Sequence, residues 1–143
     1  MRMDETDRRI IAALTADARA SFAEIGQQVS LSAPAVKRRV DRLRASGVIK
    51  GFTATVDPAA IGRTTEAFVE LFCTGRTTPA QLANATRRHP EVVGAFTVSG
   101  EADALVHLRA ADIASLEQAL ERLRAEPFVT STRSMIVLSR LTD

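Results

Sequence analysis

The sequence predicts an α+β fold in two parts, helices first and then strands and helices in alternation. Two observations support this prediction. In the first 50 residues, apolar residues recur every three or four positions, which is the period of a helix that buries one face. From residue 64 onward, strand-like stretches lie on both sides of two helical stretches, which gives the order βαββαβ.

The first two helices have clear start signals. Asp4 is placed to cap a helix that runs to about residue 18. Ser21 and Glu24 form a capping box for the second helix. Residues 30–32 then supply a turn, so the stretch from residue 21 to residue 47 is predicted to be a helix-turn-helix.

The third helix follows Ser32, carries Pro34 in its first turn and ends at Gly47. Its apolar positions recur at i, i+4 and i+7 and face a core, so the opposite side faces outward. That side has a shallow N-terminal half followed by a basic rim, a shape that the major groove of duplex DNA admits end first. The candidate DNA-contacting residues are Ser32, Pro34, Ala35, Lys37, Arg38, Arg39, Arg42 and Arg44.

The basic residues of this helix are expected to differ in role. Arg38 and Lys37 are the best candidates for base edges or nearby phosphates, whereas Arg42 and Arg44 are expected to hold phosphates, which positions a protein without reading sequence. Arg39 lies beside the apolar stripe, so either a DNA contact or an ion pair within the domain is open to it. A basic helix face alone is usually only solvated, but the turn, the caps and the preceding helix favour DNA contact here.

The segment after the third helix is predicted to be a linker strand and a hinge. Apolar and polar residues alternate through Phe52, Ala54 and Val56, and the pattern breaks at Gly62. The predicted division is a helix-turn-helix domain over residues 1–50, a linker over residues 51–63 and a second domain over residues 64–143.

The second domain is predicted to consist of two similar halves, each with a helix between two strands. The expected strands are residues 65–74, 92–99, 104–109 and 129–138, and the expected helices begin at Thr78 and Asp112. This order suits a ferredoxin-like arrangement, in which a four-stranded antiparallel sheet carries both helices on one face. The domain is small to be stable with one face of its sheet uncovered. That face is therefore expected to pair with a second copy of the chain.

Composition and charge narrow the class of protein. Residues 1–60 carry 10 Lys and Arg against 7 Asp and Glu, whereas residues 61–143 carry 9 against 10, so the basic excess lies in the first part. Cys73 is the only cysteine, which excludes an intramolecular disulfide and fits a reducing cytoplasm.

The first residues have neither the apolar region of a signal peptide nor a membrane span. We expect a cytoplasmic, nucleoid-associated protein with duplex DNA as partner and no membrane partner.

Both parts of the sequence resemble the feast/famine (Lrp/AsnC) family of prokaryotic transcription regulators. The family's DNA-binding domain is similar to DETDRRIIAALTADARASFAEIGQQVSLSAPAVKRRVDRLRASGVIKGF, and the strand, Gly-x-x-Asp turn and strand of its effector-binding domain are similar to VSGEADALVHL. The resemblance implies a winged-type helix-turn-helix and a linking strand that pairs with its counterpart in a homodimer. It also implies assembly into tetramers to octamers, and an amino acid or related metabolite as effector. We expect no other cofactor and no metal.

In the family the effector binds where two dimers meet, against the turn that here is Gly100 to Asp103. Carried over, Gly100 would let the backbone approach the ligand, and Asp103 would anchor either the turn or the ligand's ammonium group. Many relatives have an aromatic residue where this chain has Ala102, so a roomier pocket is expected. Glu101 would suit a cationic ligand, although a solvated turn carboxylate is the simpler interpretation. The effector-binding residues that the resemblance implies are Gly100, Glu101, Ala102, Asp103, Thr132 and Ser134.

The sequence therefore predicts a sequence-specific DNA-binding transcriptional regulator whose assembly and DNA binding respond to an amino acid or related metabolite. Two alternatives stay open: an architectural nucleoid-type protein with little sequence specificity, and a small-molecule enzyme on a ferredoxin-like domain. An enzyme is disfavoured because the sequence has no Cys/His pair, no Gly-rich phosphate loop and no His/Cys metal spacing. His89 is expected on the surface and His107 on a sheet face.

Overall fold

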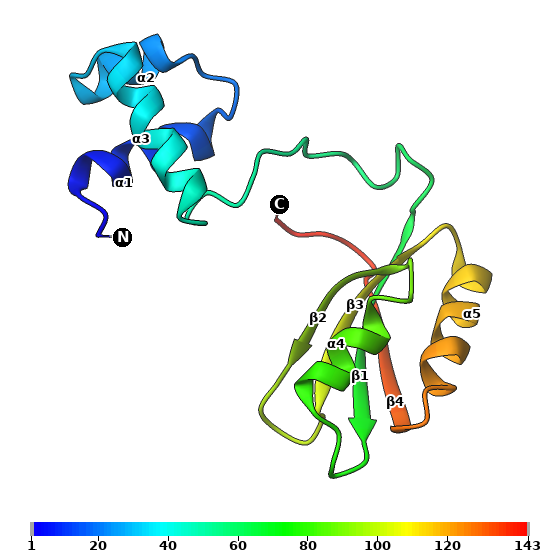
Figure 1. Ribbon diagram of the computed structural model, residues 1–143. Coiled ribbons are helices and arrows are strands. Elements are labelled where there is room, and N and C mark those ends of the chain that lie inside the picture. Colours follow the sequence, from blue (N-terminus) through cyan, green and yellow to red (C-terminus); the bar gives the residue numbers. More distant parts are fainter. Residues whose placement is uncertain (1, 143) are drawn as a thin grey trace. The chain divides into compact units, whose positions relative to one another are not determined.

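A computed structural model describes residues 2–142 and divides into two compact units, one up to Thr55 and one from Val56 onward (Figure 1). Each unit has its own cluster of buried apolar side chains. Within residues 2–142, no helix is both long and apolar enough to cross a membrane.

The first unit is a bundle of three helices. They are α1 (Glu5–Ala16), α2 (Phe22–Val29) and α3 (Ala33–Ala45). The predicted caps are confirmed: the side chains of Asp4, Ser21 and Ser32 each accept a hydrogen bond from the backbone N–H three residues later. The three helices bury one apolar stripe each against a common core formed by Ile10, Leu14, Ile25, Val29, Val36 and Val40.

The turn between α2 and α3 depends on the absence of a side chain at Gly26. Ser30 ends α2 in the left-handed conformation, with a φ of 57°, and the Leu31 N–H donates to the Gly26 carbonyl at 3.0 Å. A Cβ at Gly26 would lie 2.3 Å from the Leu31 carbonyl oxygen, well inside van der Waals contact. The turn can therefore close tightly only over glycine.

The predicted linker strand is not formed within this chain. Residues 51–57 have no regular secondary structure, and turns follow over residues 58–62. A strand needs a neighbour to pair its backbone N–H and C=O groups, and no strand of residues 2–142 pairs with this segment. The wing implied by the resemblance likewise has no strand of its own in residues 2–55.

The second unit is a four-stranded sheet with two helices. Its elements are β1 (Thr65–Cys73), α4 (Pro79–Thr86), β2 (Val92–Thr97), β3 (Ala104–Ala110), α5 (Ile113–Arg124) and β4 (Val129–Ile136). The strand order is β2-β3-β1-β4, and every neighbouring pair is antiparallel. Both helices cover the same face of the sheet (Figure 1). This confirms the predicted ferredoxin-like arrangement.

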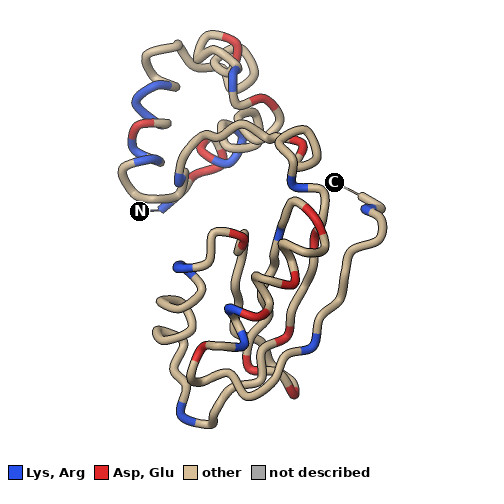
Figure 2. The backbone as a smooth tube through the Cα atoms, turned by 90° about the vertical axis from the view of Figure 1, so that its right-hand side faces the viewer, with Lys and Arg blue, Asp and Glu red and all other residues tan. Residues whose placement is uncertain are grey.

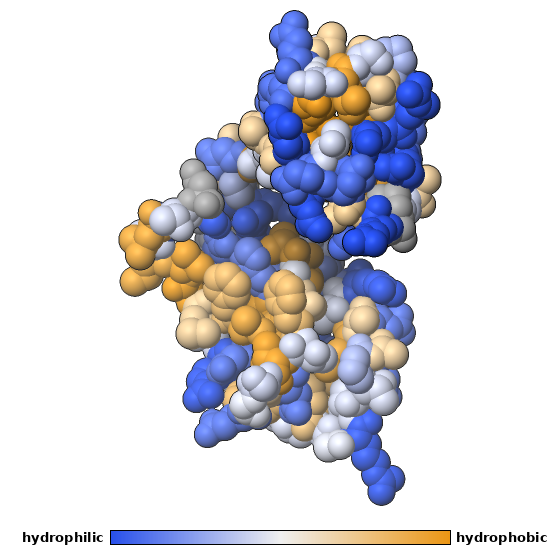
Figure 3. Space-filling view, turned by 90° about the vertical axis from the view of Figure 1, so that its left-hand side faces the viewer, coloured by the Kyte–Doolittle hydropathy of each residue, from blue (hydrophilic) through white to orange (hydrophobic). Residues whose placement is uncertain are grey.

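The two faces of the sheet differ in what covers them. On the covered face, Val69 and Leu71 of β1 and Val106 and Leu108 of β3 pack with Leu82, Leu116 and Leu123 of the helices. The alternate residues point to the other face, which no helix of the described chain covers. There Phe96 of β2 is 57% exposed and Met135 of β4 is 53% exposed. Apolar atoms accordingly gather on the surface of this unit (Figure 3).

We expect Gly26→Ala to destabilise the first unit by about 1–3 kcal/mol, because the new methyl group overpacks against backbone that cannot move aside. Helix propensity alone predicts the opposite sign, a gain of about 1 kcal/mol. Denaturant unfolding followed by circular dichroism measures the difference. Gly75→Ala is the control, because a Cβ there meets nothing within 4 Å. Unchanged stability of Gly26→Ala would show that the turn does not need glycine.

Candidate functional site

Lys and Arg recur along α3, with a single acidic residue, Asp41, among them (Figure 2). Val36, Val40 and Leu43 are buried, which fixes the helix face that points away from the core. Of the predicted DNA-contacting residues, Ala35 and Arg39 are half-buried, and the exposed ones are Ser32, Pro34, Lys37, Arg38, Arg42 and Arg44.

Arg38 differs from its basic neighbours in the contacts it makes. Lys37 pairs with Asp41 on the same helix at 2.6 Å, and the Arg44 guanidinium lies over the Phe52 ring, 5.8 Å from its centroid. Arg38 makes no salt bridge with any residue in the range 2–142. It lines a surface hollow of about 410 Å³ together with Leu31, Ala35, Arg39 and Arg42. An anionic group reaching this hollow would therefore meet several guanidinium groups.

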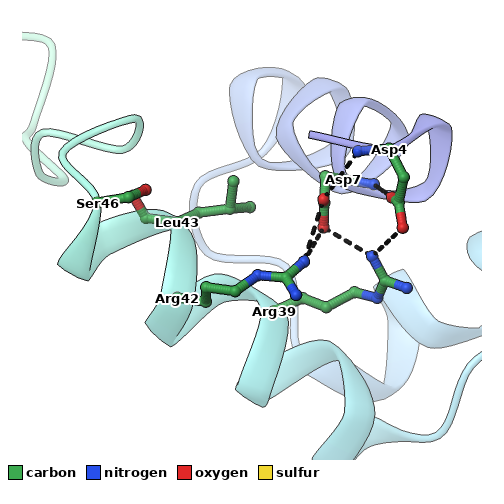
Figure 4. A network of polar contacts seen from close by, with 6 residues as sticks. All are labelled: Asp4, Asp7, Arg39, Arg42, Leu43 and Ser46. Carbon is green, nitrogen blue, oxygen red and sulfur yellow. Dashed lines mark hydrogen bonds and ion pairs between the residues drawn. The ribbon is translucent and has the colours of Figure 1, made fainter. Parts of the chain in front are cut away.

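Two arginines of α3 converge on a single carboxylate of α1 (Figure 4). Asp7 is fully buried, and its Oδ1 accepts from Arg39 Nη1 at 2.8 Å. Arg42 Nη2 donates to both Asp7 oxygens, at 3.0 and 3.1 Å. Arg39 Nη1 also donates to Asp4 Oδ2 at 2.7 Å. The start of α1 is thereby tied to two successive turns of α3.

The ionisation of these acids follows from the arginines beside them. Burial by itself would raise the pKa of Asp7, but the hydrogen bonds from Arg39 and from the Asp4 backbone outweigh it and hold that pKa below its ordinary value. The hydrogen bond from Arg39 likewise lowers the pKa of Asp4. Both carboxylates are thus charged at neutral pH. The stability that the ionised Asp4 and Asp7 carboxylates contribute is complete at pH values above the ordinary aspartate pKa. It is lost as the pH falls through their lowered pKa values in the folded protein.

Of the two roles considered for Arg39, the structure shows the ion pair within the domain, and it gives Arg42 a contact with Asp7 besides its expected phosphate contact. The Arg42 side chain is 51% exposed, so it can still meet a phosphate while it holds Asp7. Asp7 could not be found from the sequence, because its arginine partners lie 32 and 35 residues away and no local spacing links them.

The turn from Gly100 to Asp103 is fixed to the end of β1. Gly100 has a φ of 113°, a conformation that favours glycine. The Asp103 N–H donates to the Leu71 carbonyl at 2.9 Å, and Asp103 Oδ2 accepts from the Cys73 N–H at 2.7 Å. Ala102 is buried. Of the two roles considered for Asp103, the structure shows the anchoring one.

Of the remaining candidate effector residues, Glu101 belongs to this turn, whereas Thr132 and Ser134 lie on β4. Glu101 is 88% exposed, and its carboxylate lies 3.8 Å from the Arg133 guanidinium. Thr132 and Ser134 of β4 stand opposite Leu71 and Val69, so they share the helix-covered side of the sheet. Thr132 Oγ1 accepts from Arg124 of α5 at 2.9 Å. With β1 between β4 and the turn, one chain does not gather these residues into one pocket.

The expectation that His89 lies on the surface is wrong. His89 is 8% exposed, and its Nε2 lies 3.1 Å from Glu126, which also accepts from Arg88. His107 does lie on the open sheet face, where it stacks on Phe68 at 4.5 Å and bonds to Glu66. The glutamates come from distant parts of the sequence, so spacing could not reveal them. Within residues 2–142, no group of three or more His, Cys, Asp or Glu side chains is arranged to hold a metal ion.

Comparison with known proteins covers both units. Residues 3–44 match the AsnC-type helix-turn-helix domain, and residues 66–143 match the Lrp/AsnC ligand binding domain. The chain is 57% identical to the HTH-type transcriptional regulator Rv2324 of Mycobacterium tuberculosis over 142 residues, covering 99% of this chain and 96% of the relative. It is 33% identical to the leucine-responsive regulatory protein of Rhizobium meliloti over 144 residues, covering 99% and 92%.

The fold is also found in a solved structure, that of transcriptional regulator NMB0573 from Neisseria meningitidis, described as an L-Met complex. The TM-score is 0.90, with 24% sequence identity, 99% of this chain covered and 94% of the other. The likeness extends over both units, so this pairing of a helix-turn-helix with an α+β domain occurs in another regulator.

Proposed function

Because the chain belongs to the Lrp/AsnC family of transcriptional regulators, we propose that α3 enters the major groove of duplex DNA and that Arg38 reaches base edges there. The observation that supports this most directly is the state of Arg38, which is exposed and makes no ion pair with the described residues. Its neighbours Pro34 and Ala35 are small enough to let the helix approach the bases. Lys37 and Arg44 lie along one edge of the apolar stripe of α3 and suit phosphate contacts. Such a regulator works at the nucleoid in the cytoplasm.

We propose that the working unit is a symmetric homodimer, and that dimers assemble further into tetramers to octamers. A dimer places two copies of α3 in successive major grooves. The open sheet face supports this proposal, because Phe96 and Met135 leave apolar surface that a second copy can bury. Residues 51–57 support it as well, since their backbone groups have no strand partner among residues 2–142 and can pair with a second copy.

We propose an amino acid as effector, bound at the turn formed by Gly100, Glu101, Ala102 and Asp103. The names of the relatives support the ligand class, one being leucine-responsive and another described as an L-Met complex. Gly100 has no side chain to cover its backbone, and a Cβ there would meet nothing within 4 Å, so this part of the turn is open. Thr132 and Ser134 would join the site only if β4 of another copy supplied them, so effector binding would depend on assembly and would change it.

Arg38→Ala is expected to cost about 1–3 kcal/mol in binding to a preferred duplex, because a bidentate base contact is lost. The preferred duplex is obtained by selection from a random pool with the wild-type protein, and fluorescence anisotropy at one fixed salt concentration gives the affinity. Arg87→Ala removes the same charge from the second unit and should leave the affinity unchanged.

Two outcomes would contradict this proposal. Unchanged affinity of Arg38→Ala for the preferred duplex would remove Arg38 from the interface. A wild-type protein that binds the preferred and a scrambled duplex equally well at matched salt would favour an architectural DNA-binding protein over a local regulator.

Phe96→Asp and Met135→Asp are each expected to weaken dimerisation about tenfold or more, because the new carboxylate loses its water in the interface. Sedimentation velocity over a range of protein concentrations measures the dissociation constant. Ile113→Asp is the matched control, because Ile113 is 56% exposed but lies at the start of α5, away from the open face. Equal dimerisation of all three variants would place the interface elsewhere.

Asp103→Ala and Gly100→Val are expected to abolish the thermal stabilisation that the effector gives to the wild-type protein. The first removes the acceptor that anchors the turn, and the second puts a β-branched residue at a φ of 113°. A screen of the amino acids by thermal shift identifies the ligand, whose effect should grow as RT ln(1 + [L]/Kd). Gly75→Ala, in another loop, should respond as wild type. A normal response of both turn variants would move the site away from residues 100–103.

A further inference from the structure

We propose that Asp7 of α1 is a positioning residue for DNA recognition, which holds Arg39 and Arg42 and through them sets how α3 is presented to the duplex. This inference rests on the proposed binding of DNA by α3. It assigns the function of reading DNA partly to a residue that lies on another helix and is itself fully buried.

The Asp7 carboxylate is held in one orientation from two sides. Its Oδ2 accepts from the Asp4 N–H at 3.1 Å, which closes the capping box at the start of α1. Arg39 and Arg42 occupy the remaining acceptor positions from α3. A carboxylate with this many charge-assisted and backbone bonds has little freedom to rotate. The bonds it makes therefore specify one position of α3 along and around its axis.

The apolar contacts between the two helices cannot specify that position alone. Ile10 and Leu14 of α1 meet Val36 and Val40 of α3 in the core. Burial of apolar side chains is non-directional, so a small rotation or slide of α3 costs little as long as the surface stays buried. Hydrogen bonds weaken steeply with misalignment, so the same movement costs more at Asp7. The ion pairs thus supply the directional part of the packing.

The same contacts give Arg39 and Arg42 of α3 different roles. Arg39 is 27% exposed and binds both Asp4 and Asp7 through its Nη1, so its charge is balanced inside the unit. Arg42 uses one nitrogen, Nη2, on Asp7, which leaves its other donors for a phosphate oxygen. Arg42 then reaches DNA with its side chain already fixed, and little rotamer entropy is lost on binding.

When the Asp7 charge is removed, an effect of net charge and an effect on the position of α3 predict opposite changes in the affinity for a preferred duplex. On charge alone, Asp7→Asn adds one net positive charge and should raise affinity for every duplex. If Asp7 positions α3 and Arg42, affinity for a preferred duplex should fall while non-specific affinity holds or rises. The ratio of the two affinities is therefore the decisive quantity, and a merely structural role at a site remote from recognition would not change it in folded protein.

The test uses the full chain, a duplex selected from a random pool by the wild-type protein, and a scrambled duplex of the same length and composition. We expect Asp7→Asn to lower the ratio of specific to non-specific affinity about tenfold, the effect of one misplaced contact. Glu5→Gln is the matched control: it removes the same charge two residues away on α1, where the side chain is 81% exposed and its nearest cation is Arg8 at 3.9 Å. It should leave the ratio unchanged.

Circular dichroism at the assay temperature establishes that each variant is folded. Should Asp7→Asn be unfolded, Arg39→Gln decides, because Arg39 ties Asp4 and Asp7 to α3 while Arg42 still holds Asp7 in that variant. Arg39→Gln is expected to lower the ratio about tenfold and to leave the salt dependence of specific binding unchanged, since Arg39 holds no phosphate. A wild-type ratio in folded Asp7→Asn, or in Arg39→Gln, would overturn the positioning role. A wild-type protein that selects no duplex would instead contradict the proposed sequence-specific function.

Discussion

The first unit depends on one buried carboxylate. A fully buried charge is tolerated only when its hydrogen-bonding positions are filled, and Asp7 fills them with the Asp4 backbone and the guanidinium groups of Arg39 and Arg42. One side chain thereby completes the cap of α1 and joins it to α3. The price of burying this charge is a strict requirement on the geometry of both helices, which apolar packing alone would not impose.

Local signals in the sequence predicted the elements well. Caps such as Asp4, Ser21 and Ser32 act within one helical turn, and the periodicity of the strands reports the face that packs on the helices. The order of the elements then leaves few arrangements, and the observed sheet order is the ferredoxin-like one. What such signals cannot contain are contacts between residues distant in sequence. Asp7 with Arg42 and His89 with Glu126 are of that kind.

The candidate sites show the same difference between local sequence signals and contacts that join distant residues. The exposed side of α3 followed from helical phasing, so the sequence placed Arg38 correctly on it. The internal pairing of Arg39 depended on a partner 32 residues away, and phasing alone left its role open. Gly26 was missed for another reason: a glycine inside a helix looks like a weak helix former until the returning backbone at Leu31 is in place. The linker strand was overestimated because alternation predicts a strand but not its partner.

The anchored turn at Gly100 to Asp103 has a consequence for the energetics of any ligand that binds there. Its backbone is already tied to β1 through Leu71 and Cys73. A preorganised loop loses little conformational entropy on binding, so affinity reflects the contacts made and not the cost of ordering the loop. A turn that does not fold on binding also has little local change to transmit. The ligand would then act by shifting the equilibrium between oligomeric states of such a protein. That equilibrium depends on protein concentration as well as on ligand concentration.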